Sequence, residues 1–352
     1  MKATKPSLAV LFIVSSVCAA QSLRDAADRA GILVGAAVNV HYLSEPEYTA
    51  TLAHEFNMVE PEDAMKWRQI HPAEKTFDFG PADRIVEFAK NYNMKVRGHT
   101  LLWASHNPEW LTQGNYTRLQ LSDLLHEHIR QVVGHYRGQV FAWDVVNEAF
   151  EEHGWLRKSI WYNEPGISVG KHTDYIAQAF RWAHKADPDA LLFYNDAEIE
   201  EVSRKSNAVY RMVKRFRQRG VPIDGIGMQM HILRGRPNAE SIAANIARFT
   251  KLGVQVHITE MDVALPVDKD GNVLKPGDLQ WQADLYREIA RACLASRDCT
   301  ALQTWGFTDK YSWIGWETHK TKGAALLFDR QYQAKPAYEA LKEVLRRSPG
   351  RQ

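Results

Sequence analysis

The chain has 352 residues, 45% of them hydrophobic and 24% charged, which is a globular composition and excludes a disordered or fibrous protein. Its 44 Lys and Arg nearly balance its 42 Asp and Glu. Lys2 and Lys5 lie in a leader without acids, so residues 21–352 carry 42 charges of each sign. A near-neutral chain without a basic run is not expected to bind nucleic acid.

The first twenty residues have the pattern of a signal peptide. Lys2 and Lys5 form a basic start, an apolar stretch follows over Leu8–Val17, and Cys18-Ala19-Ala20 ends it with small residues. About ten apolar residues are too few to cross a hydrocarbon core of roughly 30 Å, so a membrane anchor is not expected. We expect residues 1–20 to be removed and residues 21–352 to be secreted or periplasmic, with no membrane partner.

From about residue 31, short β-rich runs alternate with longer amphipathic helical patterns such as Ser203–Arg219 and Ser241–Leu252. Eight strands, each followed by a helix, predict a (β/α)8 TIM barrel of the α/β class. A doubly wound sheet is the competing fold, but Gly35-Ala36-Ala37-Val38-Asn39 is not its Gly-rich turn. The expected strands are Ile32–Ala37, Met58–Glu60, Val96–Leu102, Val140–Asn147, Leu191–Asn195, Gly225–His231, Val254–Met261 and Leu302–Phe307.

The chain shows no linker-like stretch, no repeat and no low-complexity tract, and its last helical pattern, Ala337–Arg346, nearly reaches the end. We therefore expect residues 21–352 to form one domain, and a monomer. Two cysteines remain after the leader, Cys293 and Cys299. In an oxidising compartment they predict a disulfide that joins a helix end to the next strand, with two free thiols as the alternative.

Polar and aromatic side chains gather where six successive predicted strands end. The active site of such a barrel lies at the carboxyl ends of its strands, so these residues are the candidates for chemistry. Two carboxylates at different strand ends can face one bound glycosidic bond. Glu148 ends the fourth strand and Glu260 lies near the end of the seventh, and we take them as the catalytic pair.

Five segments, in order and in register over about residues 24–346, resemble glycoside hydrolase family 10, the endo-β-1,4-xylanase family. They are Met65-Lys66-Trp67, Arg97-Gly98-His99-Thr100-Leu101-Leu102-Trp103, Trp143-Asp144-Val145-Val146-Asn147-Glu148, Ile258-Thr259-Glu260-Met261-Asp262 and Trp305-Gly306-Phe307-Thr308-Asp309-Lys310-Tyr311-Ser312-Trp313. The resemblance implies a (β/α)8 barrel that hydrolyses internal bonds of xylan with retention. It implies no metal and no organic cofactor, with a polysaccharide as the partner, Glu148 as acid/base and Glu260 as nucleophile.

The resemblance also assigns supporting roles. Asn147 is expected to bind the 2-hydroxyl of the cleaved sugar, and His231 and Asp262, with Gln229 nearby, to hold the nucleophile ionised. Indole walls with a few polar anchors suit the apolar faces of sugars. The residues assigned to sugar binding are Glu62, Lys66, His99, Trp103, Asn147, Gln229, His231, Trp305 and Trp313. Trp143, Trp182 and Trp281 are expected to pack between elements, and Asp196 to be structural.

Four residues in three motifs depart from the family pattern. Asp63 stands where an Asn usually precedes Met-Lys-Trp, Ala104 and His106 replace residues of Trp-His-Ser-Gln, and Ala197 replaces an aromatic. Exchanging an amide for a carboxylate removes a donor and adds a charge. These changes keep open a retaining β-glycosidase of the same family that prefers a non-xylan or aryl β-glycoside.

Two further classes of protein agree less well with the sequence. A non-catalytic carbohydrate-binding barrel would be expected to lack one of the two Glu, and both are present. A metal-dependent barrel hydrolase is conceivable with 14 His, but no His-x-His follows the first strand. Strict alternation along the seventh strand is expected to place His257 on the opposite face from Glu260.

Overall fold

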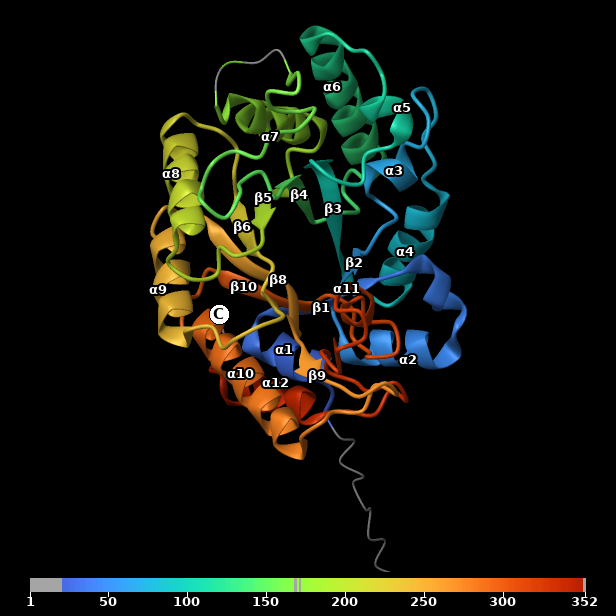
Figure 1. Cartoon of the computed structure of the whole chain (residues 1–352), viewed down its shortest axis with the longest axis vertical. Helices are drawn as coiled ribbons and strands as arrows, with labels where there is room; N and C mark the ends of the chain where they lie inside the picture. Colours follow the sequence, from blue (N-terminus) through green and yellow to red (C-terminus); the bar gives the residue numbers. More distant parts are fainter. Residues whose placement is uncertain (1–20, 168–169, 171, 351–352) are drawn as a thin grey trace, which may run out of the picture.

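A computed structural model describes residues 21–167, 170 and 172–350, in which eight parallel strands close into a barrel (Figure 1). Each strand pairs in parallel with the next, and the last pairs with both its predecessor and the first. The predicted (β/α)8 fold is confirmed. The barrel strands are β1 (Leu33–Val38), β2 (Met58–Pro61), β3 (Lys95–Trp103), β4 (Ala142–Asn147), β5 (Leu191–Asp196), β6 (Gly225–Met228), β8 (Gln255–Val263) and β10 (Cys299–Thr304).

Helices surround the barrel (Figure 1). Three short strands lie outside it, β7 (His231–Ile232), β9 (Leu265–Pro266) and β11 (Lys322–Gly323). The longer helices are α1 (Leu23–Ala30), α2 (Pro46–Glu55), α4 (Gly80–Asn91), α6 (Arg118–His135), α7 (Asp174–Ala186), α8 (Arg204–Gln218), α9 (Ala239–Thr250), α10 (Pro276–Leu294) and α12 (Pro336–Arg347). The shorter ones are η1 (Val40–Ser44), α3 (Trp67–Ile70), α5 (Glu109–Thr112) and α11 (Ile314–Glu317).

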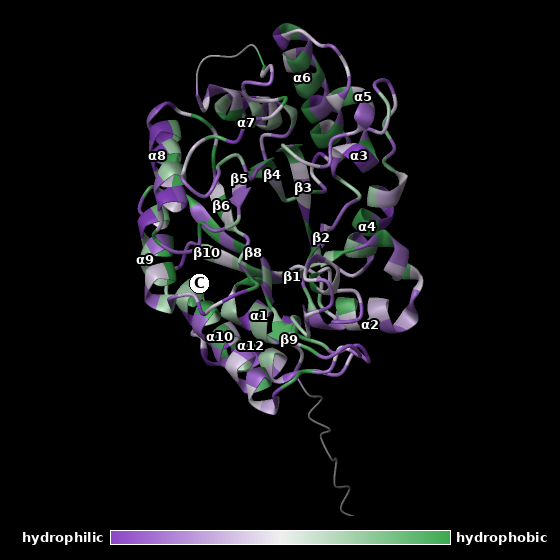
Figure 2. Cartoon of the chain, in the orientation of Figure 1, coloured by the Kyte–Doolittle hydropathy of each residue, from purple (hydrophilic) through white to green (hydrophobic). Residues whose placement is uncertain are grey.

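Helix α8 shows how local sequence fixes these elements. Ser203 accepts a hydrogen bond from the N–H of Ser206, and the hydroxyl of Ser206 is the partner of the Ser203 N–H, so the helix begins with a reciprocal cap. One face buries Val209, Met212 and Phe216. The spacing of three and four residues places these side chains on one stripe, and the helices in Figure 2 carry hydrophobic and hydrophilic colours side by side.

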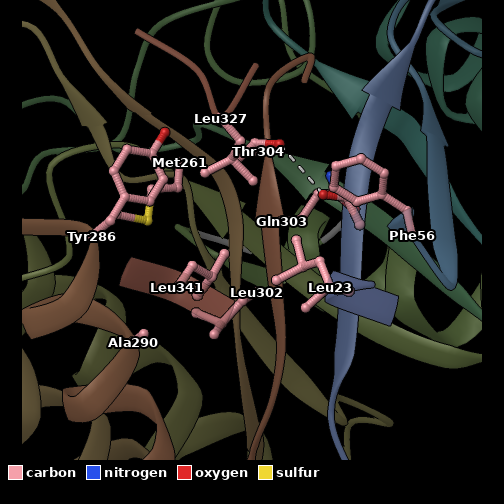
Figure 3. Close-up of a pocket in the computed structure, with 12 residues that line it drawn as sticks. Leu23, Phe56, Met261, Tyr286, Ala290, Leu302, Gln303, Thr304, Leu327 and Leu341 are labelled. Atoms are coloured by element: carbon pink, nitrogen blue, oxygen red, sulfur yellow. Dashed lines mark hydrogen bonds between the residues drawn. The ribbon is translucent and has the colours of Figure 1, made fainter. Parts of the chain in front are cut away.

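Between β1, β10 and the helices α1, α10 and α12, apolar side chains pack closely (Figure 3). Leu23, Leu302, Leu341 and Tyr286 surround a cavity of about 10 Å³, which has room for at most one water molecule. Polar atoms also border it, among them the side chain of Gln303. This wall of the barrel is therefore close-packed rather than open.

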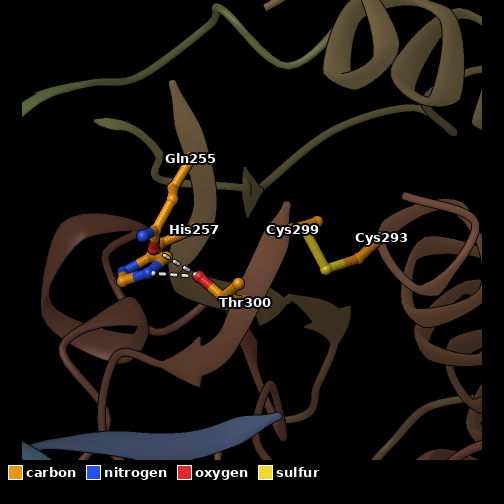
Figure 4. The surroundings of a disulfide bond; sticks show 5 residues. All are labelled: Gln255, His257, Cys293, Cys299 and Thr300. Carbon is orange, nitrogen blue, oxygen red and sulfur yellow. Dashed lines mark hydrogen bonds between the residues drawn. A yellow bond between two sulfur atoms is a disulfide. The ribbon is translucent and has the colours of Figure 1, made fainter. Parts of the chain in front are cut away.

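The predicted disulfide is present. Cys293 in the last turn of α10 is bonded to Cys299, the first residue of β10 (Figure 4). It joins a helix end to the next strand, as the spacing suggested. The predicted signal peptide, residues 1–20, lies outside the described residues. Within the described part of the chain, no helix is both long enough and apolar enough to cross a membrane.

Two predicted strand boundaries are wrong in ways that matter for the site. The expected strand Gly225–His231 ends at Met228, because the backbone turns at Met230, where φ is 67°. The expected strand Leu302–Phe307 instead runs over Cys299–Thr304, and the left-handed Gly306, with φ of 89°, leads the chain out of the sheet. Gln229 and Trp305 therefore project from turns after strands, and His231 is the first residue of the short strand β7.

Candidate active site

Glu148 follows β4 directly and has a left-handed backbone, with φ of 53°. Its amide donates to the carbonyl of Asn195, which holds this turn against the neighbouring strand. The half-buried carboxylate accepts hydrogen bonds from Trp103 Nε1 at 3.0 Å and from Gln229 Nε2 at 3.0 Å. Asn147 Nδ2 adds a longer bond at 3.3 Å. Residues from β3, β4 and the turn after β6 thus fix the direction of this carboxylate.

Glu260 lies on β8 and is 4% exposed. Asn195 Nδ2 donates to its Oε1 at 2.7 Å, and His231 Nε2 lies 2.9 Å from its Oε2. Burial alone would raise the pKa of this carboxyl, but the hydrogen bond and charge of His231, with the Asn195 donor, outweigh it and lower the pKa. Glu260 is therefore held as an anion.

His231 bridges two carboxylates. Its Nδ1 lies 3.1 Å from Asp262 Oδ2, opposite the contact of Nε2 with Glu260. Both ring nitrogens face anionic acceptors, so both carry hydrogen and the ring is an imidazolium. Burial acts to lower its pKa, yet the charge of Asp262 and the hydrogen bonds raise it well above the ordinary value. Trp313 Nε1 donates to the same Asp262 oxygen at 2.8 Å, which orients this second carboxylate.

Two amides connect the two glutamates. Asn195 Nδ2 donates both to Glu260 and to Asn147 Oδ1, the latter at 2.9 Å. Asn147 Nδ2 in turn donates to Glu148. The carboxylates are thus linked through two side chains on the neighbouring strands β4 and β5. The sequence marked Asn195 only as one polar residue at a strand end, and its place between the two predicted catalytic residues was missed.

Four charged side chains fill the barrel behind these residues, and each is at most 2% exposed. Arg97 Nε lies 3.2 Å from Asp144 Oδ2 and 3.3 Å from Glu60 Oε2. His99 Nδ1 lies 3.0 Å from Asp144 Oδ2. Burial, followed by the charge of Asp144, raises the pKa of Glu60 to about 8. The sequence assigned His99 to sugar binding but gave no role to Glu60, and neither Arg97 nor Asp144 was singled out beyond its motif.

Among the described residues, Glu60, His99 and Glu260 form a group whose possible metal-ligand atoms lie within 4.8 Å of one another. His99 Nδ1 already faces Asp144 and both Glu260 oxygens have hydrogen-bond partners, whereas Glu60 Oε1 has none. The cations of Arg97 and His231 also balance the carboxylates. We therefore assign this group to hydrogen bonding rather than to metal binding.

The predicted sugar-binding residues from the third strand and the turn after β2 come together. Lys66 Nζ lies 5.4 Å from the ring centres of both Trp103 and Trp305, and 3.1 Å from Asp63 Oδ1. Burial, then the charge of Asp63, raises the pKa of Glu62 to about 7. An ammonium between two indoles and beside two carboxyls offers both apolar walls and hydroxyl partners to a sugar.

Asp63 and His106, two of the departures from the family pattern, lie at this same place. Asp63 pairs with Lys66, and the ring of His106 stacks on Trp103 with centres 4.6 Å apart. By contrast Asp196, predicted to be structural, is buried against Lys205 Nζ at 2.8 Å and bonded to the Tyr194 hydroxyl. Asp63 and His106 thus border the sugar-binding group, whereas the hydrogen bonds given for the Glu148 and Glu260 carboxylates do not include them.

The prediction that His257 and Glu260 lie on opposite faces is wrong. His257 Nδ1 accepts from Arg97 at 2.8 Å, and Arg97 contacts Glu60 inside the barrel, next to Glu260. The register of β8 against β10 shifts between the pairs that include Ile258 and Met261. This irregularity breaks strict alternation and turns the Glu260 side chain inward. Figure 4 shows the other ring nitrogen of His257 bonded to Thr300.

A closed (β/α)8 barrel with two carboxylates and aromatic side chains at the carboxyl ends of its strands defines the glycoside hydrolase class. The comparison with protein families agrees, because the model of glycosyl hydrolase family 10 matches residues 22–344. The chain therefore belongs to glycosyl hydrolase family 10.

Its relatives include proteins named as xylanases. Endo-1,4-beta-xylanase B of Thermotoga neapolitana is 44% identical over 92% of this chain and 91% of its own length. A beta-1,4-xylanase of Dictyoglomus thermophilum is 41% identical over 87% and 86% of the two chains. Among solved structures, xylanase 10B from Thermotoga petrophila in complex with xylobiose is 45% identical, with a TM-score of 0.87, covering 92% of this chain and 97% of that one.

Proposed function

We propose that this protein is a retaining endo-1,4-β-xylanase in which Glu148 is the acid/base and Glu260 the nucleophile. The observation that carries the proposal is the unequal environment of the two carboxylates. Glu260 is buried and held as an anion by His231 and Asn195, whereas Glu148 is half-buried among three neutral donors. The relatives named as endo-1,4-beta-xylanases support the choice of xylan as substrate.

The first step forms a glycosyl-enzyme. Glu260 attacks the anomeric carbon while Glu148 gives its proton to the leaving glycosidic oxygen. A carboxylate with a lowered pKa is ionised at neutral pH and so is ready to attack. The Asn147 amide stands between the two carboxylates, where it can bind the 2-hydroxyl of the sugar that is cleaved.

The second step returns the enzyme to its starting state. Glu148, now a base, takes a proton from water, which attacks the anomeric carbon and releases Glu260. Two displacements at one carbon retain its configuration. Lys66, His99, Trp103, Trp305 and Trp313, with Glu62 and Gln229, would hold the sugar rings during both steps.

We also propose that the domain occupies residues 21–352 after removal of a signal peptide, residues 1–20, and acts as a secreted or periplasmic monomer. The composition of the leader and the disulfide between Cys293 and Cys299 support export. N-terminal sequencing of the protein recovered outside the cytoplasm tests the cleavage site, and light scattering of the purified protein tests the monomer.

A second candidate is a family 10 β-glycosidase that prefers another glycoside. It is favoured by the Asp63–Lys66 ion pair and by His106 on Trp103, since both border the predicted sugar-binding residues. Reducing-sugar release from xylan, β-glucan and aryl β-glycosides separates the two. We expect xylan to be cleaved internally and fastest; negligible xylan cleavage beside rapid turnover of another glycoside would favour the second candidate.

The catalytic assignment is tested with Glu148→Ala and Glu260→Ala on xylan and on a dinitrophenyl β-xylobioside. Glu260→Ala should be inactive on both. Glu148→Ala should lose about 10²- to 10⁴-fold on xylan but still react with the aryl substrate, whose leaving group needs no proton. Azide should accelerate that variant and yield a β-glycosyl azide. Near-wild-type xylan turnover in either variant would refute the assignment.

A further inference from the structure

The side-chain amide of Gln303 on β10 has two acceptors. Its Nε2 donates to the carbonyl of Thr259 at 2.6 Å and to Glu60 Oε2 at 2.7 Å, so both amide hydrogens are used. Gln303 is 1% exposed. It thus joins the strand that bears Glu260 to a carboxyl group on β2, on the far side of β1. The catalytic scheme above assigns this residue no role.

The amide can cross β1 because that strand has no side chain at the crossing point. Gly35 on β1 is in register with Gln303 on one side and with Met58 of β2 on the other. A Cβ added at Gly35 would lie 3.0 Å from Gln303 Oε1 and 2.6 Å from Met58 Cε. Figure 3 shows Gln303 beside β1. Any larger residue at Gly35 would displace Gln303, Met58 or both.

Thr259, one of the two acceptors of the Gln303 amide, is joined to the proposed nucleophile both through the chain and through Asn195. Thr259 precedes Glu260 in the chain, and its hydroxyl donates to Asn195 Oδ1 at 2.7 Å. The Nδ2 of Asn195 donates to Glu260 Oε1. The Thr259 residue is thus held at its carbonyl by Gln303 and at its hydroxyl by the amide that binds the nucleophile.

Glu60, the other acceptor of the Gln303 amide, also lies close to Glu260. Glu60 belongs to the group with His99 and Glu260 whose polar atoms lie within 4.8 Å. Its Oε2 faces both Gln303 and Arg97 Nε, at 2.7 and 3.3 Å, which leaves Oε1 on the side of His99, 3.5 Å from His99 Nδ1. Gln303 and Arg97 therefore hold the Glu60 carboxyl group together, so that its Oε1 is turned toward the residues around the nucleophile.

We propose that Gln303 is a positioning residue for the nucleophile: passing over Gly35, its amide fixes the Thr259–Glu260 backbone and Glu60 relative to each other. This inference rests on the proposed role of Glu260. It predicts that losing the amide disturbs the attack of Glu260 more than the binding of substrate, because the amide donates its hydrogen bonds to Thr259 and Glu60 and not to a sugar-binding residue. It also predicts that the Asn195 bond to Glu260 weakens, which raises the pKa of that carboxyl.

Gln303→Met, which keeps the length of the side chain and removes both donors, tests the proposal. Gln282→Met is a matched control, since buried Gln282 also donates its Nε2 to two acceptors, the carbonyls of Val263 and Ala324 at 2.7 and 2.6 Å. We expect both variants to lower the Tm by similar amounts. Only Gln303→Met should lower kcat on an aryl β-xylobioside, by about 10- to 100-fold with KM within threefold, and move the acid limb of kcat/KM to higher pH.

Gly35→Ala supplies an independent test, because it leaves the Gln303 amide in the protein but adds a Cβ that would lie 3.0 Å from its Oε1. Alone it should reproduce the loss of kcat, and in the Gln303→Met background it should add less than twofold. Unchanged kcat and acid limb in Gln303→Met, or the same changes in Gln282→Met, would overturn the proposal. Glu260→Ala, measured alongside, distinguishes a failure of the Gln303 proposal from a failure of the proposed function. If Glu260→Ala remains active, Glu260 is not the nucleophile, whatever the result for Gln303.

Discussion

The imidazole of His231 lies between Glu260 and Asp262, with its Nε2 2.9 Å from Glu260 Oε2. The three side chains are buried or nearly so, and the ring is the cation shared by two anions. Removing a buried charge of this kind leaves its partners uncompensated. The ionisation of the proposed nucleophile therefore depends on this ring, although His231 lies on β7 and Glu260 on β8.

Replacing His231 with Asn keeps one donor and removes the positive charge. We expect His231→Asn to raise the pKa of Glu260 and to lower kcat/KM by about 10²-fold, because an essential anion loses its strongest partner. A pH profile of kcat/KM should show the acid limb displaced to higher pH. The prediction is wrong if activity falls while the acid limb stays where it is in the wild type.

The contact of His231 with the two carboxylates also makes the stability of the fold depend on pH. The pKa of His231 is raised in the folded protein, so its contribution is fully present below the unfolded value of about 6.5 and is lost as pH rises through the folded pKa. Urea unfolding of the wild type and His231→Asn should therefore differ most at pH 6 and least at strongly alkaline pH. A difference that grows with pH would contradict this.

Asn195 offers a test at a residue that the sequence did not assign. Asn195→Ala removes the donor to Glu260 Oε1 and the bond to Asn147 at once. We expect kcat to fall by about 10²-fold or more and the acid limb to rise, since both carboxylates lose part of their support. Asn207→Ala, a matched change at a partly buried Asn on α8 that bonds Arg248, should leave both quantities unchanged.

The sequence predicted the barrel and pointed to Glu148 and Glu260 as the candidate catalytic pair, because both predictions depend on local information. Alternation of strands and helices sets the order of the barrel, and Glu148 and Glu260 lie within motifs near strand ends. The predicted face of His257 was wrong because the irregularity of β8 arises from its pairing with β10, and a periodic sequence pattern does not indicate such an irregularity. The contact of Gln303 with Glu60 was inaccessible for a similar reason, since it depends on the register of three strands and on a glycine between them.

Asp63, a departure from the family pattern, is expected to set the pH range of substrate binding. Burial and the charge of Asp63 raise the pKa of Glu62 to about 7. An ionised Glu62 accepts stronger hydrogen bonds from sugar hydroxyls than a protonated one. KM for a xylo-oligosaccharide should therefore fall as pH rises from about 6 to 8. In Asp63→Asn the pKa of Glu62 drops, and the same change should occur at lower pH.

Glu62→Gln is the control for that prediction, because the amide cannot ionise. Its KM should be flat across the same interval, while kcat keeps its ordinary pH dependence. If KM in the wild type is already flat between pH 6 and 8, then Glu62 does not contribute to binding in the proposed way. If Asp63→Asn leaves the inflection of KM in place, the charge of Asp63 is not its cause.

His128 gives a prediction for acid stability away from the site. It is fully buried, its ring stacks on Trp67 with centres 3.6 Å apart, and burial lowers its pKa well below the ordinary value. As pH falls below about 6.5 the unfolded chain gains a proton that the folded protein does not, so stability falls by up to about 1.4 kcal/mol per pH unit. His128→Phe keeps an aromatic ring against Trp67 and removes this pH-dependent loss of stability.

We therefore expect the free energy of unfolding of His128→Phe, relative to the wild type, to rise as pH is lowered from 7.5 to 5. Glu60 and Glu62, whose pKa values are raised, act in the opposite direction, but they are present in both proteins and cancel in the difference. Urea unfolding at three pH values measures it. A difference that does not change with pH in His128→Phe would mean that the buried ring gains its proton without unfolding.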